Sequence, residues 1–355
     1  MSSQQEIVTQ WQQNGWKDMF THVLGQHVEL IDDDIQCLKA SRKRTSVWKL
    51  MITNHIQSLP VVLKIYKKPL KGNHQVEINM YEKGHEVLQE FMPKLYGVEI
   101  VNDDELWMFF EYVRPLRGQI KLVPKHLEKI IPTVAKFHAH TFESHYLRYE
   151  DTFNAWVPSY YSNKKNREKT KHIEKTKKHL ERGMENQRVR KVLEPHYDVL
   201  QNVLQKGPIF FPEIIEAGQS LIHGDMHIHN ISCHNATEAQ DWQIRFVDWE
   251  SVKYAPVWFD LVVLVEILLD FRRDWQKDAE EIRKKCIDVY SKEIEKYGVT
   301  FSSDPLNLLK MTYLQRTLEK KLSNHIRRML RGEKSPLLAK YLQKINDWGK
   351  ELGLY

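Results

Sequence analysis

Two short blocks of the sequence place acidic and amide side chains at spacings that suit a metal ion and a phosphate. The first block, LIHGDMHIHN, contains Asp225 and Asn230, and the second, FVDWE, contains Asp248 and Glu250. In each block the polar residues directly follow a short apolar run, so that a loop at a strand end would hold them in place. A turn between the two strands would bring three carboxylates and one amide oxygen together.

Oxygen ligands of this kind are those that Mg²⁺ prefers, because it is a hard cation that also bridges to substrate phosphates. Clustered like charges cost several kcal/mol unless a cation neutralises them or some of them bind protons. A purely structural role for all of these acids is therefore disfavoured. Four histidines and one cysteine lie in or near the first block, but their spacing matches no closed tetrahedral metal site.

The elements that must position these residues fall into two regions. Before residue 113, short runs rich in β-branched and aromatic residues predict strands, three or four of them forming an antiparallel meander, with a turn at 32–34. The stretch 75–91 has a helix-like spacing. We expect a five-stranded sheet with one inserted helix. The predicted strand segments are 28–31, 35–39, 47–52, 60–66, 95–101 and 105–113.

After residue 113 the pattern is mostly helical, with strand-like signals only at 221–222 and 244–247. The fold class that this order predicts is α+β, with a β-rich lobe over 1–113 and a larger, helical lobe over 114–355. The predicted helices are 126–142, 164–205, 261–271, 279–297, 304–331 and 336–352.

The amino-acid composition limits the kinds of partner that we expect this protein to bind. The chain has 355 residues, 53 Lys and Arg, 47 Asp and Glu, and a net charge of +6. The segment 164–182 holds nine of the basic residues against three acids, which accounts for the whole excess. A charge confined to one segment without interleaved aromatic residues is typical of a solvated helix surface, so we expect no nucleic-acid partner.

A membrane and an oxidising compartment are also disfavoured. The longest apolar stretch, 257–269, contains Asp260 and Glu266 and is shorter than the roughly 20 residues that cross a bilayer. The first residues lack the apolar segment of a signal peptide. Three cysteines, widely separated and odd in number, fit a reducing compartment. We therefore expect a cytoplasmic protein without a membrane partner.

The two blocks resemble a known family. HGDMHIHN, around Asp225, resembles the HGDxHxxN catalytic loop of the aminoglycoside phosphotransferase and choline-kinase-like enzymes, and VDWE resembles their IDWE/IDFD metal loop. The segment APVWFDL, which includes Asp260, is similar to the family segment that follows. More weakly, VLKI around Lys64 resembles the family's third-strand lysine block, and 134–141 resembles the helix before the catalytic loop. The resemblance implies a bilobal protein-kinase-like fold.

The family resemblance also implies roles for single residues. Asp225 would be the base or orienter of an attacking hydroxyl, and Asn230 and Asp248 would bind Mg²⁺. Lys64 would contact the α- and β-phosphates of ATP, with Glu77 holding it in place. Phosphoryl transfer fits such a set, because positioning and charge neutralisation supply most of the acceleration.

Several assignments have competitors. Glu250 would bind a second metal ion or face solvent, and Glu82 and Glu86 compete with Glu77 as the partner of the lysine. Asp260 is expected to brace a loop rather than to act in catalysis.

The nucleotide would be held by two further segments. Residues 107–112 would form the hinge that reads adenine, with Phe110, Glu111 and Tyr112 at its end, although aromatic residues of such a strand are as often ordinary core. The segment 39–48 would lie over the phosphates but contains no glycine, so that Ser46 and its neighbours would have to supply hydroxyl and cationic contacts. Those neighbours are Ser41, Arg42, Lys43, Arg44 and Thr45.

The acceptor is expected to be a hydroxyl of a small molecule. Only twelve positions separate Asp248 from Asp260, which leaves no space for the activation segment of a protein kinase. In the family the acceptor binds in the helical lobe, so residues from roughly 150 to 210 and the last helices would line the site, with Trp156, Tyr160, Tyr161 and the basic segment as candidates. That segment would repel aminoglycosides. A sugar, an amino alcohol or an anionic metabolite is left open.

A different class of function competes with this one. A kinase-like binding or structural protein without turnover, similar to bacterial spore-coat components of this fold, would explain the missing glycines. Retention of Lys64, Asp225, Asn230 and Asp248 together favours an ATP- and Mg²⁺-dependent enzyme. The sequence gives no indication of the oligomeric state.

Overall fold

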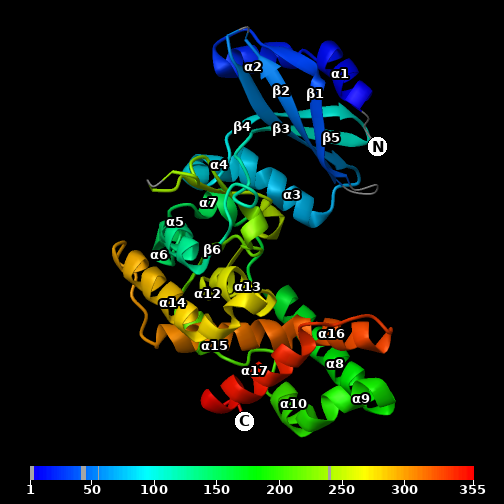
Figure 1. Ribbon diagram of the computed structural model, residues 1–355, viewed down its shortest axis with the longest axis vertical. Helices are drawn as coiled ribbons and strands as arrows, with labels where there is room; N and C mark the ends of the chain where they lie inside the picture. The colour runs from blue at the N-terminus through cyan, green and yellow to red at the C-terminus, as the bar shows by residue number, and fades with distance from the viewer. Residues whose placement is uncertain (1–3, 41–44, 55, 239–240) are drawn as a thin grey trace. The chain divides into compact units, whose positions relative to one another are not determined.

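The computed structural model describes residues 4–40, 45–54, 56–238 and 241–355. By their contacts the residues form two compact units, each built from two chain segments. The first unit comprises Met1–Lys121 and His229–Ser251, and the second comprises Leu122–Ile228 and Val252–Tyr355. Figure 1 labels the elements of both units. The two predicted lobes, 1–113 and 114–355, stay a prediction.

The first unit contains a five-stranded antiparallel sheet, as predicted. Its strands lie in the order β1-β2-β3-β5-β4, so that β3 and β5 are central and the hairpin β4–β5 closes one side (Figure 1). Their alternating, β-branched sequences suit a pleated sheet with a buried face. The bounds are β1 Glu29–Ala40, β2 Thr45–Thr53, β3 Ser58–Lys67, β4 Leu95–Asn102 and β5 Glu105–Glu111.

The turn predicted at 32–34 is wrong. Strand β1 runs through these residues, and its register against β2 shifts between Leu30 and Ile35. Because β1 lies at the edge of the sheet, three exposed aspartates are accommodated by an irregular pairing instead of ending the strand.

Two helices that we did not predict cover one face of this sheet. Helices α1 (Gln4–Gln13) and α2 (Trp16–Leu24) are short, but Trp16 and Phe20 point into a core that includes Trp107 and Phe109 of β5. The ring of Trp16 lies 4.9 Å from the rings of both Trp107 and Phe109. These two aromatic residues of the predicted hinge are therefore core residues.

The predicted inserted helix is present, but it is not regular. It consists of α3 (Gly72–Asn79), the π-helical turn η1 (Met80–Gly84), α4 (His85–Leu88) and the 3₁₀ turn η2 (Gln89–Phe91). A π-helical turn adds a residue and shifts the buried face, which explains the imperfect apolar spacing in the sequence.

A small hairpin completes the first unit. Strands β7 (Ile231–Cys233) and β8 (Ile244–Phe246) pair in antiparallel fashion, and the 3₁₀ turn η6 (Trp249–Ser251) follows and packs against α3. The residues of the two sequence blocks therefore flank one hairpin.

The second unit is mainly helical, as predicted, with one short strand pair, β6 (Gln219–Ile222) and β9 (Lys253–Pro256). Within the described ranges, no helix is both long and apolar enough to span a bilayer. The helices are α5 Leu127–His140, α6 Ser144–Leu147, α7 Glu150–Phe153, α8 Asn163–Glu185, α9 Gln187–Leu193, α10 Tyr197–Gln205, α11 Glu213–Glu216, α12 Trp258–Leu261, α13 Ile267–Phe271, α14 Ala279–Glu295, α15 Pro305–Arg316, α16 Leu322–Leu330 and α17 Leu338–Glu351. Two π-helical turns, η7 (Val262–Glu266) and η9 (Thr317–Lys321), join α12 to α13 and α15 to α16.

Candidate active site

The centre of the first unit's candidate site is the ammonium group of Lys64. This residue lies on the central strand β3, and its Nζ donates hydrogen bonds to both carboxylate oxygens of Glu77, each at 2.7 Å. It also donates to Oδ1 of Asp248 at 2.8 Å. The sequence paired Lys64 with Glu77, and the structure brings these two together and adds Asp248.

Burial makes these ion pairs strong. The side chain of Glu77 is 1% exposed and that of Lys64 is 12% exposed. Burial alone would lower the pKa of Lys64, but Glu77 and Asp248 outweigh it and raise the pKa, so the lysine stays protonated. Burial raises the pKa of Glu77, and the charge of Asp248 adds to that effect although Lys64 opposes it. Nζ of Lys39 lies 3.9 Å from Oδ2 of Asp248 and is a second, more exposed cation at this site.

The β7–β8 hairpin places Asp248 and Asn230 at the same end. The backbone N–H of Val247 donates to the carbonyl oxygen of Asn230 at 3.0 Å, so that Asn230 directly precedes β7 where Asp248 follows β8. Asp248 has φ of 69°, in the left-handed region that few non-glycine residues adopt. A strained backbone at a carboxylate that is also ion-paired indicates a constrained functional position.

Glu250 completes an acidic group with Glu77 and Asp248. One carboxylate oxygen from each lies within 4.8 Å of the others. Asn73 of α3 donates its Nδ2–H to Glu250 Oε2 at 2.8 Å, which fixes the orientation of this acid. The donor set consists of hard oxygen ligands with an excess of negative charge, and it fits a divalent cation such as Mg²⁺. The sequence did not place Glu77 in this group.

The end of the predicted hinge borders the same face of the sheet. Phe110 is paired with Val62 of β3, two residues from Lys64, and its ring lies 4.4 Å from the ring of Tyr81. The backbone N–H of Glu111 donates to the carbonyl oxygen of Lys94 at 2.9 Å. Because β5 is paired on both sides up to Phe110, the backbone suited to reading a base begins after Glu111, at Tyr112.

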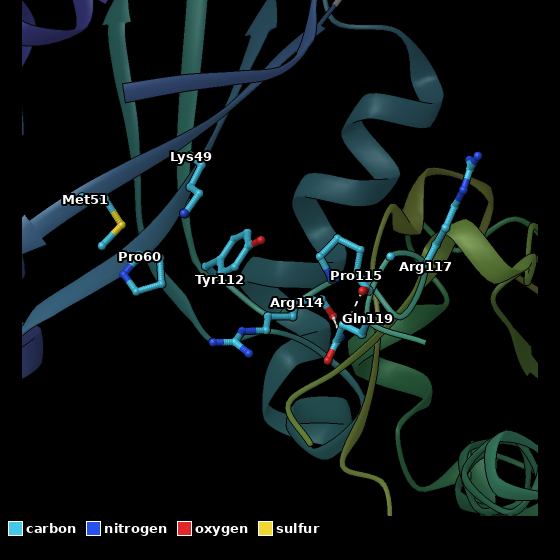
Figure 2. A pocket seen from close by; sticks show the side chains of 9 residues that line it. Lys49, Met51, Pro60, Tyr112, Arg114, Pro115, Arg117 and Gln119 are labelled. Carbon is cyan, nitrogen blue, oxygen red and sulfur yellow. Dashed lines mark hydrogen bonds between the residues drawn. The ribbon is translucent and has the colours of Figure 1, made fainter. Parts of the chain in front are cut away.

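A cavity of about 450 Å³ opens at this position. Figure 2 shows Lys49 of β2 directed toward the Tyr112 ring, with Nζ 5.3 Å from the ring centroid. Lys49 is paired with Val62, so strand alternation places it on the face that carries Lys64. The lining residues are Lys49, Met51, Pro60, Tyr112, Arg114, Pro115, Arg117, Gly118 and Gln119.

The predicted phosphate loop is only partly described. Ser41, Arg42, Lys43 and Arg44 lie outside the described residues. Ser46 is paired with Ile65, and its Oγ accepts a hydrogen bond from Nε1 of Trp48 at 3.1 Å. Strand alternation places Ser46 on the face opposite Lys64, so the structure does not bring these two together.

Asp225 belongs to the second unit, in the loop after β6. Asp260 accepts hydrogen bonds from the backbone N–H groups of His223, at 2.7 Å, and of Gly224, at 2.8 Å. His138 Nε2 lies 3.3 Å from the same carboxylate. Gly224 has φ of 77°, which a side chain would disfavour. Asp260 braces the loop that carries Asp225, as the sequence indicates.

The surroundings of Asp225 keep its carboxylate ionised. His227 Nε2 lies 3.4 Å from Oδ2, and this contact lowers the pKa of Asp225 although burial opposes it. His223 and Lys321 lower the pKa further. An ionised carboxylate held on a braced loop can accept a hydrogen bond from a substrate hydroxyl. Sequence analysis missed Lys321, because no local motif marks a residue so distant in the chain.

A family model described as the ecdysteroid kinase-like family matches residues 44–296. No curated protein matches the chain in sequence. The choline kinase of Cryptosporidium parvum Iowa II is similar in structure, with a TM-score of 0.58 at 13% identity over 99% of this chain and 98% of that one. A spectinomycin phosphotransferase, solved with ADP and spectinomycin, gives 0.52 at 10% identity over 97% and 98%. These similarities show a protein-kinase-like fold.

Proposed function

The chain belongs to the ecdysteroid kinase-like family, and from this premise we propose that it transfers the γ-phosphoryl group of ATP to a hydroxyl of a small molecule. The observation that carries the proposal is the ion-paired group of Lys64, Glu77 and Asp248. Burying a lysine and its carboxylate partners carries a desolvation penalty, and groups perturbed in this way cluster at binding and catalytic sites. The structural neighbours named above, a choline kinase and a spectinomycin phosphotransferase, support a small-molecule acceptor.

The first unit would bind the nucleotide. Lys64 would contact the α- and β-phosphates, and Glu77 would keep the ammonium group in place. The base would lie at the cavity beside Tyr112, on the sheet face that also carries Lys64, while the side chain of Phe110 would form the wall of the pocket. Glu111 would shape the hinge through its backbone hydrogen bond to Lys94.

Asp248 and Asn230 would hold Mg²⁺, with Glu250 as a further oxygen ligand. A bound Mg²⁺ neutralises charge on the phosphates and orients the γ-phosphoryl group. Glu77, which contributes to the same acidic group, would remain engaged by Lys64. The hydrogen bond from Asn73 holds the Glu250 carboxylate in place, so that this side chain would move little when Mg²⁺ binds.

In the second unit, Asp225 would orient the acceptor hydroxyl and accept its proton. The pKa of this carboxylate is lowered, so it is a weak base whose main contribution is to hold the hydroxyl in line. Asp260 would act only by bracing the loop. We place this chemistry in the cytoplasm, since Cys37, Cys233 and Cys286 are all free thiols.

The second candidate is a kinase-like binding protein without turnover. One observation favours it: no glycine occurs in 39–48, where the backbone would have to approach the phosphates closely. Such a protein would have no need for an oriented, ionised Asp225, and this favours the enzyme.

A ³²P-transfer screen of the purified protein against pooled hydroxylated metabolites tests the proposal, with the Asp225→Asn variant as the control. We expect a labelled product with the unaltered protein only. A melting-temperature scan with ATP and Mg²⁺ runs in parallel, because a ligand at 100 times its Kd stabilises a fold by roughly 2.7 kcal/mol. A thermal shift without any labelled product would favour the binding protein, and the absence of both would contradict each candidate.

A further inference from the structure

The surroundings of Asp225 are rich in cations, which the family resemblance does not explain. Lys253 begins strand β9 and is paired with Ile222, the last residue of β6, three positions before Asp225. Its Nζ lies 5.8 Å from the ring centroid of Phe259. A half-buried lysine thus lies on the strand beside the one that leads into the Asp225 loop.

Lys321 approaches Asp225 from another element. It ends the π-helical turn η9, which also carries Glu319 and Lys320, and it is close enough to Asp225 for their charges to interact. π-helical turns inside longer helices occur often at functional sites, because they redirect side chains that a regular helix would place elsewhere. The turn packs against α8, the basic helix.

Helix α8 supplies a third lysine. Lys169 is 3% exposed, and its Nζ donates to the carbonyl oxygen of Tyr160 at 2.9 Å. The same atom lies 3.2 Å from the ring centroid of Tyr160 and 4.4 Å from that of Tyr161. The hydroxyl of Tyr161 is buried and has no hydrogen-bond partner in the described part of the chain. A cation, an aromatic surface and an available hydroxyl therefore adjoin Lys253, whose charge acts on Lys169.

The carboxylates near these lysines are already engaged. Asp260 accepts the loop N–H groups, Glu319 accepts a hydrogen bond from the Tyr160 hydroxyl, and Asp225 pairs with His227. The cations that act on one another here are Lys169, Lys253, Arg316, Lys320 and Lys321, which we call the cation cluster.

The members of the cation cluster lie close enough for their like charges to repel one another. Burial, together with neighbouring cations, lowers the pKa of Lys321 to about 8 although Asp225 opposes this effect. Burial, with the charges of Lys253 and Lys165, also lowers the pKa of Lys169 to about 8 although Glu319 opposes it. An oxyanion bound among them would relieve the repulsion, whereas a cationic acceptor would add to it.

We infer that the acceptor is a hydroxylated molecule bearing a carboxylate, sulfate or phosphate group, which Lys253 and Lys321 bind while its hydroxyl lies at Asp225. The inference rests on the proposed function, since it names the substrate class of that site. Tyr160 and Tyr161 would contact the apolar part of such a molecule. Choline, ethanolamine and aminoglycosides, all cations, would be excluded.

The test compares acceptors in pairs, in which one member carries a carboxylate where the other carries a neutral hydroxymethyl or ester group. The pairs are glycerate and glycerol, gluconate and sorbitol, and cholate and its methyl ester, each with ATP, Mg²⁺ and constant ionic strength. We expect the anionic member of every labelled pair to have the higher kcat/KM, by about tenfold, as one charge-assisted contact provides. In the Lys253→Gln/Lys321→Gln variant the ratio falls toward one, whereas Lys292→Gln, at an exposed position of α14, leaves it unchanged.

The outcomes separate the inference from the function it rests on. Equal or faster transfer to the neutral members would overturn the inference and leave the kinase activity standing. If Lys321→Gln lowers kcat/KM equally for the anionic and the neutral member of a pair, the lysine acts on the transferring phosphoryl group and not on the charge of the acceptor. That result would also overturn the inference. Circular dichroism establishes that each variant is folded.

A binding measurement tests the inference even if the protein transfers no phosphoryl group. Sulfate, titrated against sodium chloride at equal ionic strength, should protect the unaltered protein and Lys292→Gln from thermal unfolding, and should protect the double variant less. If no acceptor is labelled, the proposed function fails, and equal protection of all three proteins by sulfate would then overturn the inference independently.

Discussion

The two units differ in the sign of the charge that their candidate sites leave uncompensated. In the first unit, the three clustered carboxylates of Glu77, Asp248 and Glu250 lie near Lys64 and the more exposed Lys39. In the second unit, Asp225 interacts with Lys321, a member of the cation cluster. We propose that the first arrangement binds a cation and the second an anion.

The proposed function would use this difference in charge to bind the metal ion and the acceptor at separate sites. In the proposed function, Mg²⁺ would add positive charge where carboxylates are crowded, and the acceptor would add negative charge where lysines are crowded. Each site would be destabilised by its own like charges until its ligand binds, so that ligand affinity would be gained at a cost in stability.

The largest expected effect is on stability, in Lys64→Met. Removing the lysine leaves Glu77 buried and unpaired, and breaking a buried ion pair lowers the free energy of unfolding by about 3 to 5 kcal/mol. Urea denaturation measures it. Adding Glu77→Gln should recover part of the loss. In the second unit, Lys321→Met removes repulsion instead, and we expect a change of about 1 kcal/mol or less. Equal losses in the two units would contradict the charge difference.

The second largest expected effect is on turnover, in Asp225→Ala. We expect turnover to fall by at least about two orders of magnitude, because the orienting carboxylate is lost, while the affinity for nucleotide is retained. Steady-state kinetics and calorimetry measure the two quantities. Asp288→Ala, at an exposed position of α14, is the control. Unchanged turnover in Asp225→Ala would show that this carboxylate has no role in the reaction.

Asp248→Asn should weaken binding rather than turnover alone. Asparagine tolerates the left-handed backbone at this position, so the fold is retained while one charged ligand is lost. We expect the affinity for the Mg²⁺–nucleotide complex to fall by about tenfold or more, and the affinity for nucleotide with a chelator to change little. Calorimetry with and without Mg²⁺ separates the two. An unchanged affinity with Mg²⁺ would rule out Asp248 as a metal ligand.

The smallest expected effect is a pH dependence. Lys321 has a pKa lowered to about 8, so it is charged below pH 8 and becomes neutral above it. The KM for an anionic acceptor should therefore rise by roughly threefold to tenfold between pH 7 and 9, and that for its neutral counterpart should not. Lys321→Gln should flatten the profile, and an identical profile in that variant would contradict the assignment. The charged groups that act on or with Lys321 are Arg316, Lys320, Lys253, Asp225 and His325.

Much of the fold followed from the sequence, because the sheet is built from local pairings. The predicted strands of the first unit lie within a few residues of β2 to β5, and the helical second unit follows the 3.6-residue pattern. The differences have local causes. Strand β1 continues through acidic residues because an edge strand tolerates them, and η1 interrupts the inserted helix with a π-helical turn. Helices α1 and α2 were missed because each buries only two large residues.

The candidate site was predicted less completely. The motifs identified Asp225, Asn230, Asp248 and Glu250 because their spacing is local. The grouping of Glu77 with the two acids after β8 was not predictable, since it depends on α3 packing against η6. The role of Ser46 stays a prediction.

The sequence by itself identified the candidate residues for the chemistry, because a loop motif is a local feature that does not depend on how its neighbours pack. The tertiary structure alone decided what charge surrounds them. Lys321 and Lys169 come from α15–α16 and α8, which meet only through packing of the second unit. Electrostatic energy depends on distance in space and on burial, and neither quantity is written in the spacing of residues along a chain.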